Sequence, residues 1–140
     1  MILSLMRILG AFLSLLVCAG CQGPIHTDAD KDVAEPKLLR MELAIPVCAE
    51  ELRRSDVGGV YTTVLIGNDG SVREVQVEEG AGPEGKASRE YTEAVKAAGC
   101  DEEVERAVKQ WRFKPAEKDG RPVAYRMRVG VTIEFANAQR

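Results

Sequence analysis

The alternation of residue types over 123–135 is the sequence feature that most limits what this chain can fold into. Every odd position from Val123 to Phe135 is apolar, and every even position is small, polar or charged. Side chains of a β-strand point to opposite faces with a period of two residues. The stretch therefore predicts a long antiparallel strand with one buried face and one face in water.

A hairpin is predicted upstream of that strand. Residues 60–66 are rich in β-branched side chains, and residues 72–78 alternate, with valines on one face. Asn68, Asp69 and Gly70 lie between the two runs, and these residue types tolerate left-handed backbone angles. Before the hairpin, Pro46 favours the first turn of a short helix that ends near Arg54.

Two helices are expected after the hairpin, because apolar residues recur there at i, i+3, i+4 and i+7. Gly99 is expected to end the first helix, and Asp101 is placed to cap the second. The segment 111–115, WRFKP, then reads as a short strand. The order of elements predicts an α+β fold: a small antiparallel sheet of three to four strands packed against one or two helices. The positions expected in its core include Val104, Val108, Trp111 and Phe113.

The N-terminus has the features of a secretory signal peptide over residues 1–20. Arg7 precedes an apolar run that is shorter than the roughly 20 residues needed to span a bilayer, although a membrane anchor stays an alternative. Ala19-Gly20-Cys21 resembles the lipobox of bacterial lipoproteins, which implies a lipid on Cys21. An ordinary cleaved signal with a free Cys21 thiol is the other interpretation.

Residues 21–43 are polar and acidic without a sustained apolar period, so we expect a flexible tether before a domain at 44–140. Residues 22–105 hold nine basic and 19 acidic side chains, whereas 106–140 hold nine and three. This distribution favours pairing of charges within the domain, and no nucleic-acid partner is expected. Cys48 and Cys100 are candidates for a disulfide in an oxidising compartment, but their spacing alone leaves open whether they are bridged.

Catalytic and cofactor sites find little support in the sequence. The single histidine, His26, lies in the expected tether, and no spacing of metal ligands is present. The stretch 80–85, GAGPEG, has the form G-x-G-x-x-G, but the strand before it is charged and two glutamates adjoin it. We therefore expect no enzyme, no metal and no cofactor.

Residues 45–135 resemble the C-terminal domain of the TonB energy-transducer family. The resemblance depends most on the block from Asp101 to Pro115, in which Ala107 and Val108 precede Trp-Arg-Phe-x-Pro in register. The family's long proline-rich segment and uncleaved inner-membrane helix have no counterpart here. The segment around 82–99 looks like an insertion, and the sequence assigns it no role.

The resemblance implies a module on the periplasmic side of the envelope that binds an outer-membrane transporter, or another envelope protein, by β-strand addition. Lipid on Cys21 would hold it, more at the outer than the inner membrane. A homodimer is compatible with such a sheet. An envelope lipoprotein without a transport role and, less favoured, a small enzyme are the alternatives. The residues implied in partner binding are Glu50, Arg126, Arg128, Gly130 and Thr132.

Overall fold

The computed structural model describes residues 23–40 and 44–136. Its central sheet has the strand order β1-β9-β4-β5. Strand β4 (Gly59–Ile66) is antiparallel to both of its neighbours, β5 (Val72–Ala81) and β9 (Tyr125–Thr132). The expected α+β architecture is confirmed. The sheet is mixed rather than purely antiparallel, because β1 (His26–Thr27) joins the outer side of β9 in parallel.

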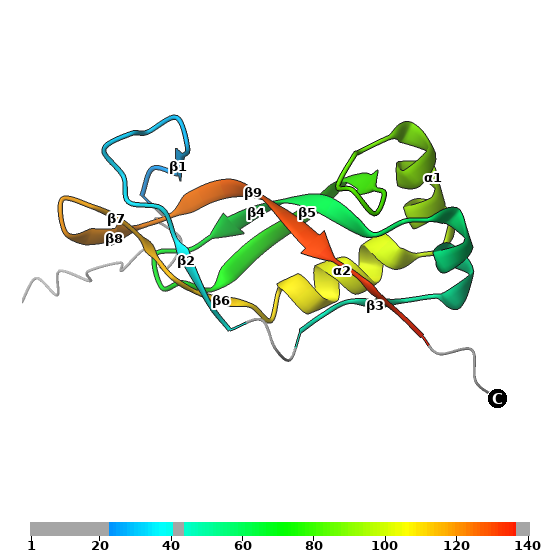
Figure 1. Ribbon diagram of the computed structural model, residues 1–140. Helices are drawn as coiled ribbons and strands as arrows, with labels where there is room; N and C mark the ends of the chain where they lie inside the picture. The colour runs from blue at the N-terminus through cyan, green and yellow to red at the C-terminus, as the bar shows by residue number, and fades with distance from the viewer. Residues whose placement is uncertain (1–22, 41–43, 137–140) are drawn as a thin grey trace, which may run out of the picture.

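Two helices, α1 (Arg89–Ala97) and α2 (Cys100–Val108), pack against one face of this sheet, as Figure 1 shows. Ser88 caps α1 by accepting a hydrogen bond from the Tyr91 amide. Gly99 joins the helices with a φ of 65°, a left-handed conformation that costs glycine little. It therefore ends α1, as expected, and it also takes the capping position that the sequence assigned to Asp101. Among the described helices, none is both long and apolar enough to span a membrane.

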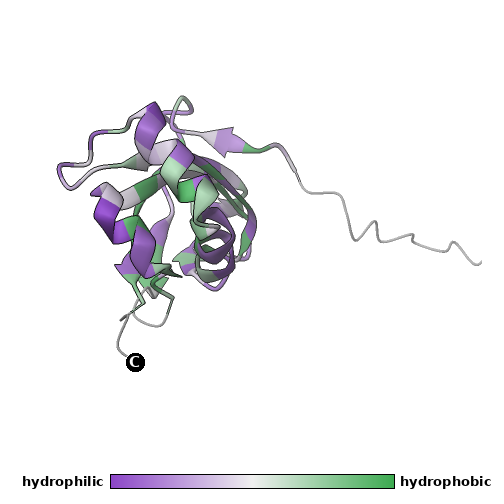
Figure 2. Cartoon of the chain, turned by 90° about the vertical axis from the view of Figure 1, so that its right-hand side faces the viewer, coloured by the Kyte–Doolittle hydropathy of each residue, from purple (hydrophilic) through white to green (hydrophobic). Residues whose placement is uncertain are grey.

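The hydrophobic core lies between the helices and the inner face of the sheet. Figure 2 shows the green, apolar residues gathered inside and purple, hydrophilic residues along the outer surface of the helices. The helical spacing found in the sequence explains this arrangement, since Val95, Val104 and Val108 are each at most 1% exposed. They meet valines of β4 and β5 and the end of β9 in one continuous cluster.

Trp111 joins the second helix to the next strand. It lies three residues after the end of α2 and is 3% exposed, and its indole Nε1–H donates to the Ala44 carbonyl at 3.0 Å. The Phe113 ring, in β6 (Arg112–Lys114), lies with its centre 6.5 Å from the Trp111 ring. A buried aromatic side chain of this size stabilises a fold by about 3–5 kcal/mol relative to alanine.

The Cys48–Cys100 disulfide is present, with a Cα–Cα distance of 5.2 Å. It links the short strand β3 (Val47–Cys48) to the start of α2. The expected helix from Pro46 is wrong in its start and type. The chain is extended at β3 and turns into a 3₁₀-helix only at η1 (Glu50–Ser55), because residues 46–48 pair with the C-terminal end of the chain.

The long terminal strand is divided into three pieces. Strand β8 (Arg121–Val123) forms a hairpin with β7 (Ala116–Lys118), β9 lies in the main sheet, and β10 (Glu134–Phe135) pairs in parallel with β3. The alternation itself is unbroken through β9, where no register shift interrupts the pairing with β4.

Residues 23–40, here called the strap, differ from the expected flexible tether. Their first strand, β1, pairs with β9, and their last, β2 (Lys37–Arg40), is antiparallel to β6. Between these strands Val33 is 7% exposed and packs against Ala116 and Tyr125. An acidic segment that buries one of its large apolar side chains, Val33, can thus fold onto a domain that offers a pocket for it.

Candidate functional site

Among residues 23–40 and 44–136, the outer edge of β9 is paired only at its two ends. At the N-terminal end, β1 covers Tyr125 and Arg126. Beyond the C-terminal end, β3 covers Glu134 and Phe135. We call the open stretch between them, residues 127–133, the edge notch. At about 3.3 Å per residue, the edge notch has room for an added strand of about five or six residues.

Alternation along the strand determines which backbone groups face the edge notch. The His26 amide donates to the Ala124 carbonyl at 3.0 Å, and the Glu134 amide donates to the Pro46 carbonyl at 2.9 Å, so even-numbered residues face outward at both ends. The Val129 carbonyl instead lies on the β4 side, 3.4 Å from the Thr62 hydroxyl. Backbone groups of residues i and i+2 point to the same side of a strand. The amides and carbonyls of Arg128, Gly130 and Thr132 therefore face the edge notch, and all three residues are exposed.

The side chain of Arg128 is drawn away from the edge notch. Its guanidinium lies 4.2 Å from the centre of the Tyr61 ring and pairs with the carboxylates of Glu78 and Glu79 on β5. Arg126 makes a similar pair with Glu74 at 3.3 Å. These ion pairs cross β4, so both arginines lie over the exposed face of the sheet and leave the backbone edge clear.

The face of β9 that points to the helices offers apolar contacts at the edge notch. Met127 and Val129 are half-buried and pack against the core, while Val131 is 3% exposed. An added strand would place alternate side chains beside Met127 and Val129. The added strand would thereby cover the core beside these two residues, where the core is only partly shielded from water.

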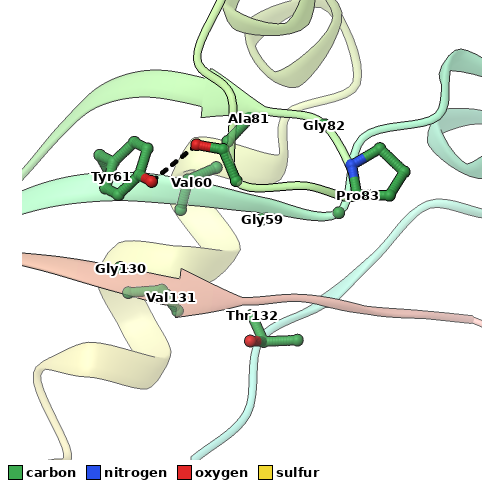
Figure 3. A pocket seen from close by; sticks show the side chains of 11 residues that line it. Gly59, Val60, Tyr61, Ala81, Gly82, Pro83, Gly130, Val131 and Thr132 are labelled. Carbon is green, nitrogen blue, oxygen red and sulfur yellow. Dashed lines mark hydrogen bonds between the residues drawn. The ribbon is translucent and has the colours of Figure 1, made fainter.

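A hollow of about 260 Å³ adjoins the edge notch on the exposed face of the sheet. Figure 3 shows it between the ends of β4, β5 and β9 and the turn that contains Gly82 and Pro83. The Tyr61 hydroxyl donates to the Gly85 carbonyl at 2.7 Å and so holds that turn against the sheet. Backbone and glycine form most of the lining, and no cluster of metal ligands occurs in residues 23–40 or 44–136.

Contacts between the strap and the domain shift the pKa of one group on each side. Burial raises the pKa of Tyr125, and the carboxylates of Glu35, Asp28 and Asp30 raise it further. The Lys118 ammonium, 3.1 Å from Asp32, holds the pKa of that carboxyl below its usual value. These contacts place the strap close to the hairpin β7–β8 and do not form a catalytic arrangement.

The residues implied in partner binding do not all lie together. Arg126, Arg128, Gly130 and Thr132 share the outward side of β9, although the backbone of Arg126 is already covered by β1. Glu50 lies apart from them, on η1 beyond β3, where its carboxylate pairs with Arg53. His26, assigned by the sequence to a disordered segment, lies in β1 and is 8% exposed.

The strap residues that touch the edge of β9 were missed by sequence reasoning. The one available signal was Val33, the only large apolar residue between Ile25 and Leu38. Strands β1 and β3 are two residues long, which is too short for any periodic pattern to reveal. Cys21 lies outside the described residues.

Comparisons with known proteins found one matching family model, which covers part of the chain. Residues 83–136, which hold both helices and β6 to β10, match the sequence model of the Gram-negative bacterial TonB protein C-terminal family. Among solved structures, the solution structure of the Pseudomonas aeruginosa TonB C-terminal domain is 26% identical; the match covers 84% of this chain and 100% of that chain, with a TM-score of 0.41. No curated protein matches this chain. Over residues 83–136 the chain is therefore similar to the C-terminal domain of the Gram-negative bacterial TonB protein.

Proposed function

We propose that the edge notch binds an extended segment of an envelope protein by β-strand addition, as an accessory to transport across the outer membrane. The observation that carries the proposal is the row of backbone groups on Arg128, Gly130 and Thr132, which no other described residue pairs with, between two occupied ends. Backbone hydrogen bonds supply affinity in this mode of recognition, and the pockets for alternate side chains supply choice. The family match supports an outer-membrane transporter as the source of the segment.

The partner segment is limited in length and pattern by the edge notch. About five or six residues fit between β1 and β3 without displacing either. Side chains on the helix-facing side meet Met127 and Val129, so apolar residues are favoured at alternate positions. On the opposite side the segment runs past Gly130, where no side chain separates it from Tyr61 and the hollow.

A titration of the isotope-labelled full chain tests this proposal. Synthetic peptides from the N-terminal segments of outer-membrane transporters are added while backbone amide shifts are followed. Saturable shifts at Arg128, Gly130 and Thr132 are expected. Shifts confined to η1, or no shifts in a well-dispersed spectrum, would leave an envelope protein without this mode of binding.

Two substitutions at Gly130 distinguish the effect of losing its backbone amide from the effect of adding a side chain. Gly130→Pro removes the amide that faces the edge notch, at a position where proline is tolerated because it lies on an edge. Gly130→Ala keeps the amide, and its methyl group would lie 3.5 Å from the Tyr61 ring, an ordinary contact. We expect the proline variant to bind the peptides about tenfold more weakly, since one amide bond to the added strand is lost, and the alanine variant to bind like the wild type.

We also propose that lipid on Cys21 ties the domain to the membrane on its periplasmic side. Support comes from the lipobox-like sequence before Cys21. Because the strap folds onto the domain from Gly23, only about 7 Å of chain separates the first described residue from Cys21. Incorporation of labelled palmitate into the wild type, and its loss in Cys21→Ser, is the expected result. A Cys21→Ser chain that stays labelled and membrane-bound would contradict it.

A further inference from the structure

The strap is held to the domain unequally along its length. Its central part is firmly attached, since Val33 is buried against Ala116 and Tyr125. Ala34 and Glu117 also exchange two backbone hydrogen bonds, of 2.8 and 3.1 Å. Removing this part would expose apolar surface and break a bonded pair of backbone groups.

The N-terminal part of the strap has a much smaller attachment. Strand β1 consists of His26 and Thr27 alone, and the residues before it, from Gly23 to Ile25, are exposed. The His26 amide donates to the Ala124 carbonyl at 3.0 Å. The His26 imidazole is largely covered, but its Nδ1 contacts Asp30 of the strap itself, at 3.5 Å, so this contact moves with β1.

The turn after β1 is closed by its own hydrogen bonds. The Asp30 amide donates to the Thr27 carbonyl at 2.9 Å, and the Asp30 carboxylate accepts from the Thr27 amide at 2.8 Å. None of these bonds involves the sheet. Strand β1 and its turn can therefore leave β9 as one unit while Val33 stays in place.

Strand β1 occupies the backbone positions that continue the open row of the edge notch. The even-numbered residues Ala124 and Arg126 face outward beneath it, directly before Arg128. We propose that β1 is a displaceable strand of this chain that shortens the edge notch, and that an extended partner longer than about six residues binds by taking its place. This inference rests on the proposed function of the edge notch and adds an internal competitor to it.

A pair of substitutions at His26 tests the competition in the full chain. His26→Pro removes the amide that bonds to Ala124 and so releases β1, whereas His26→Ala keeps the amide and loses the same imidazole contacts. The probes are a transporter peptide of about nine residues and its truncation to about six residues. Trp111 emission and hydrogen exchange at the Ala34 amide confirm that each variant keeps its fold and the central attachment of the strap.

Relative to His26→Ala, we expect His26→Pro to bind the longer peptide about fivefold more tightly, because a competing backbone bond no longer has to be broken. The shorter peptide should bind both variants equally. In the wild type, the longer peptide should raise the exchange rate of the His26 amide and leave that of the Ala34 amide unchanged.

Each other result has a distinct meaning. Equal affinity of both variants for the longer peptide, with unchanged exchange at His26, would overturn the competition and leave strand addition intact. If neither peptide binds the wild type or either variant, the proposed function fails and the competition fails with it. Binding of the longer peptide to His26→Pro alone would support the competition in its strongest form.

Discussion

The two outer edges of the sheet differ in how much of each is covered by other parts of the chain. The edge of β5 is closed at its C-terminal end, where the Gly80 amide donates to the Thr92 hydroxyl at 3.0 Å and the Gly80 carbonyl accepts from Ser88 at 3.3 Å. Two register shifts also interrupt the pairing of β5 with β4. The edge of β9 has no register shift, and within the part of the chain that the structure describes it is open over the edge notch.

Proteins protect sheet edges with bulges, charges and covering segments, because an open regular edge pairs with other chains. Strand β5 carries such protection, including the exposed residues Arg73, Glu74, Glu78 and Glu79. The edge of β9 has Gly130 at its centre, and its one exposed charge, on Arg128, is turned toward β5. The open edge of β9 is therefore a local exception in a sheet whose other edge is protected.

Loss of the disulfide should have the largest effect on the fold and on the closure of the β9 edge by β3. With Cys48 and Cys100 both replaced by alanine, we expect the free energy of unfolding to fall by about 4 kcal/mol, as the chain-entropy estimate gives for a loop of this length. The amides of Glu134 and Ala136, which bond to Pro46 and Cys48, should also exchange faster than those of β4. Denaturant unfolding and hydrogen exchange measure the two effects. Unchanged exchange at Glu134 would show that β3 closes the edge notch without its covalent link.

Two glycines, one on each edge, allow a matched comparison of packing. A methyl group at Gly80 would lie 2.4 Å from the Tyr91 carbonyl oxygen, so α1 would have to move. At Gly130 the nearest atom would be 3.5 Å away. We expect Gly80→Ala to destabilise the fold by about 1–3 kcal/mol and Gly130→Ala by less than about 0.5 kcal/mol. Equal thermal and denaturant midpoints for the two variants would show that the sheet edges are packed equally closely at these two glycines.

The ion pairs that join β9 to β5 should contribute less. Arg126 and Glu74 lie on either side of Leu65, which is 4% exposed although it belongs to the open face of the sheet. In a double-mutant cycle with Arg126→Ala and Glu74→Ala, we expect a coupling free energy of about 0.2–1 kcal/mol that decreases in high salt. A coupling free energy that does not change with salt would indicate that the aliphatic parts of Arg126 and Glu74 act by covering Leu65.

The smallest effect is expected at the turn that leads into β5. The Ser71 side chain and amide donate to the Asp69 carboxylate at 2.6 and 3.0 Å and hold its pKa below the usual 3.8. A carboxylate whose pKa is lowered by folding stabilises the folded state above its usual pKa, and the stabilisation is lost as pH falls through the folded-state pKa. The Ser71 amide shift should therefore titrate below pH 3.8. In Asp69→Asn this titration should disappear; its persistence would assign it to another group.

Sequence reasoning succeeded where local chemistry decides the structure. The hairpin of β4 and β5 depends on β-branched strands and a turn in which Gly70 has a φ of 81°, and both signals lie within a few residues. The helices follow the same rule, since their apolar spacing and the Gly99 break are local. The inward alternation of 123–135 also survives in β9, because one face of that strand meets the core.

Sequence reasoning failed where contacts between segments far apart in the chain determine the structure. The strap is fixed by Val33 against Ala116 and Tyr125, a contact across more than 80 positions that no composition rule can reveal. The helix expected from Pro46 gives way to β3 because β10 supplies backbone partners there. The same limit applies to the edge notch, since its ends depend on two strands of two residues each.

The disulfide also divides the chain topologically. It closes residues 48–100 into a covalent ring that contains β4, β5 and α1, while the strap and β9 belong to the two tails outside it. In the oxidised chain the contacts within the ring are short in sequence, so the hairpin and α1 can form first. Strand β9 must then arrive from the C-terminal tail, and until it does the free edge of the nascent sheet is that of β4. An assembly in this order has two successive acceptor edges, and only the second persists in the finished fold.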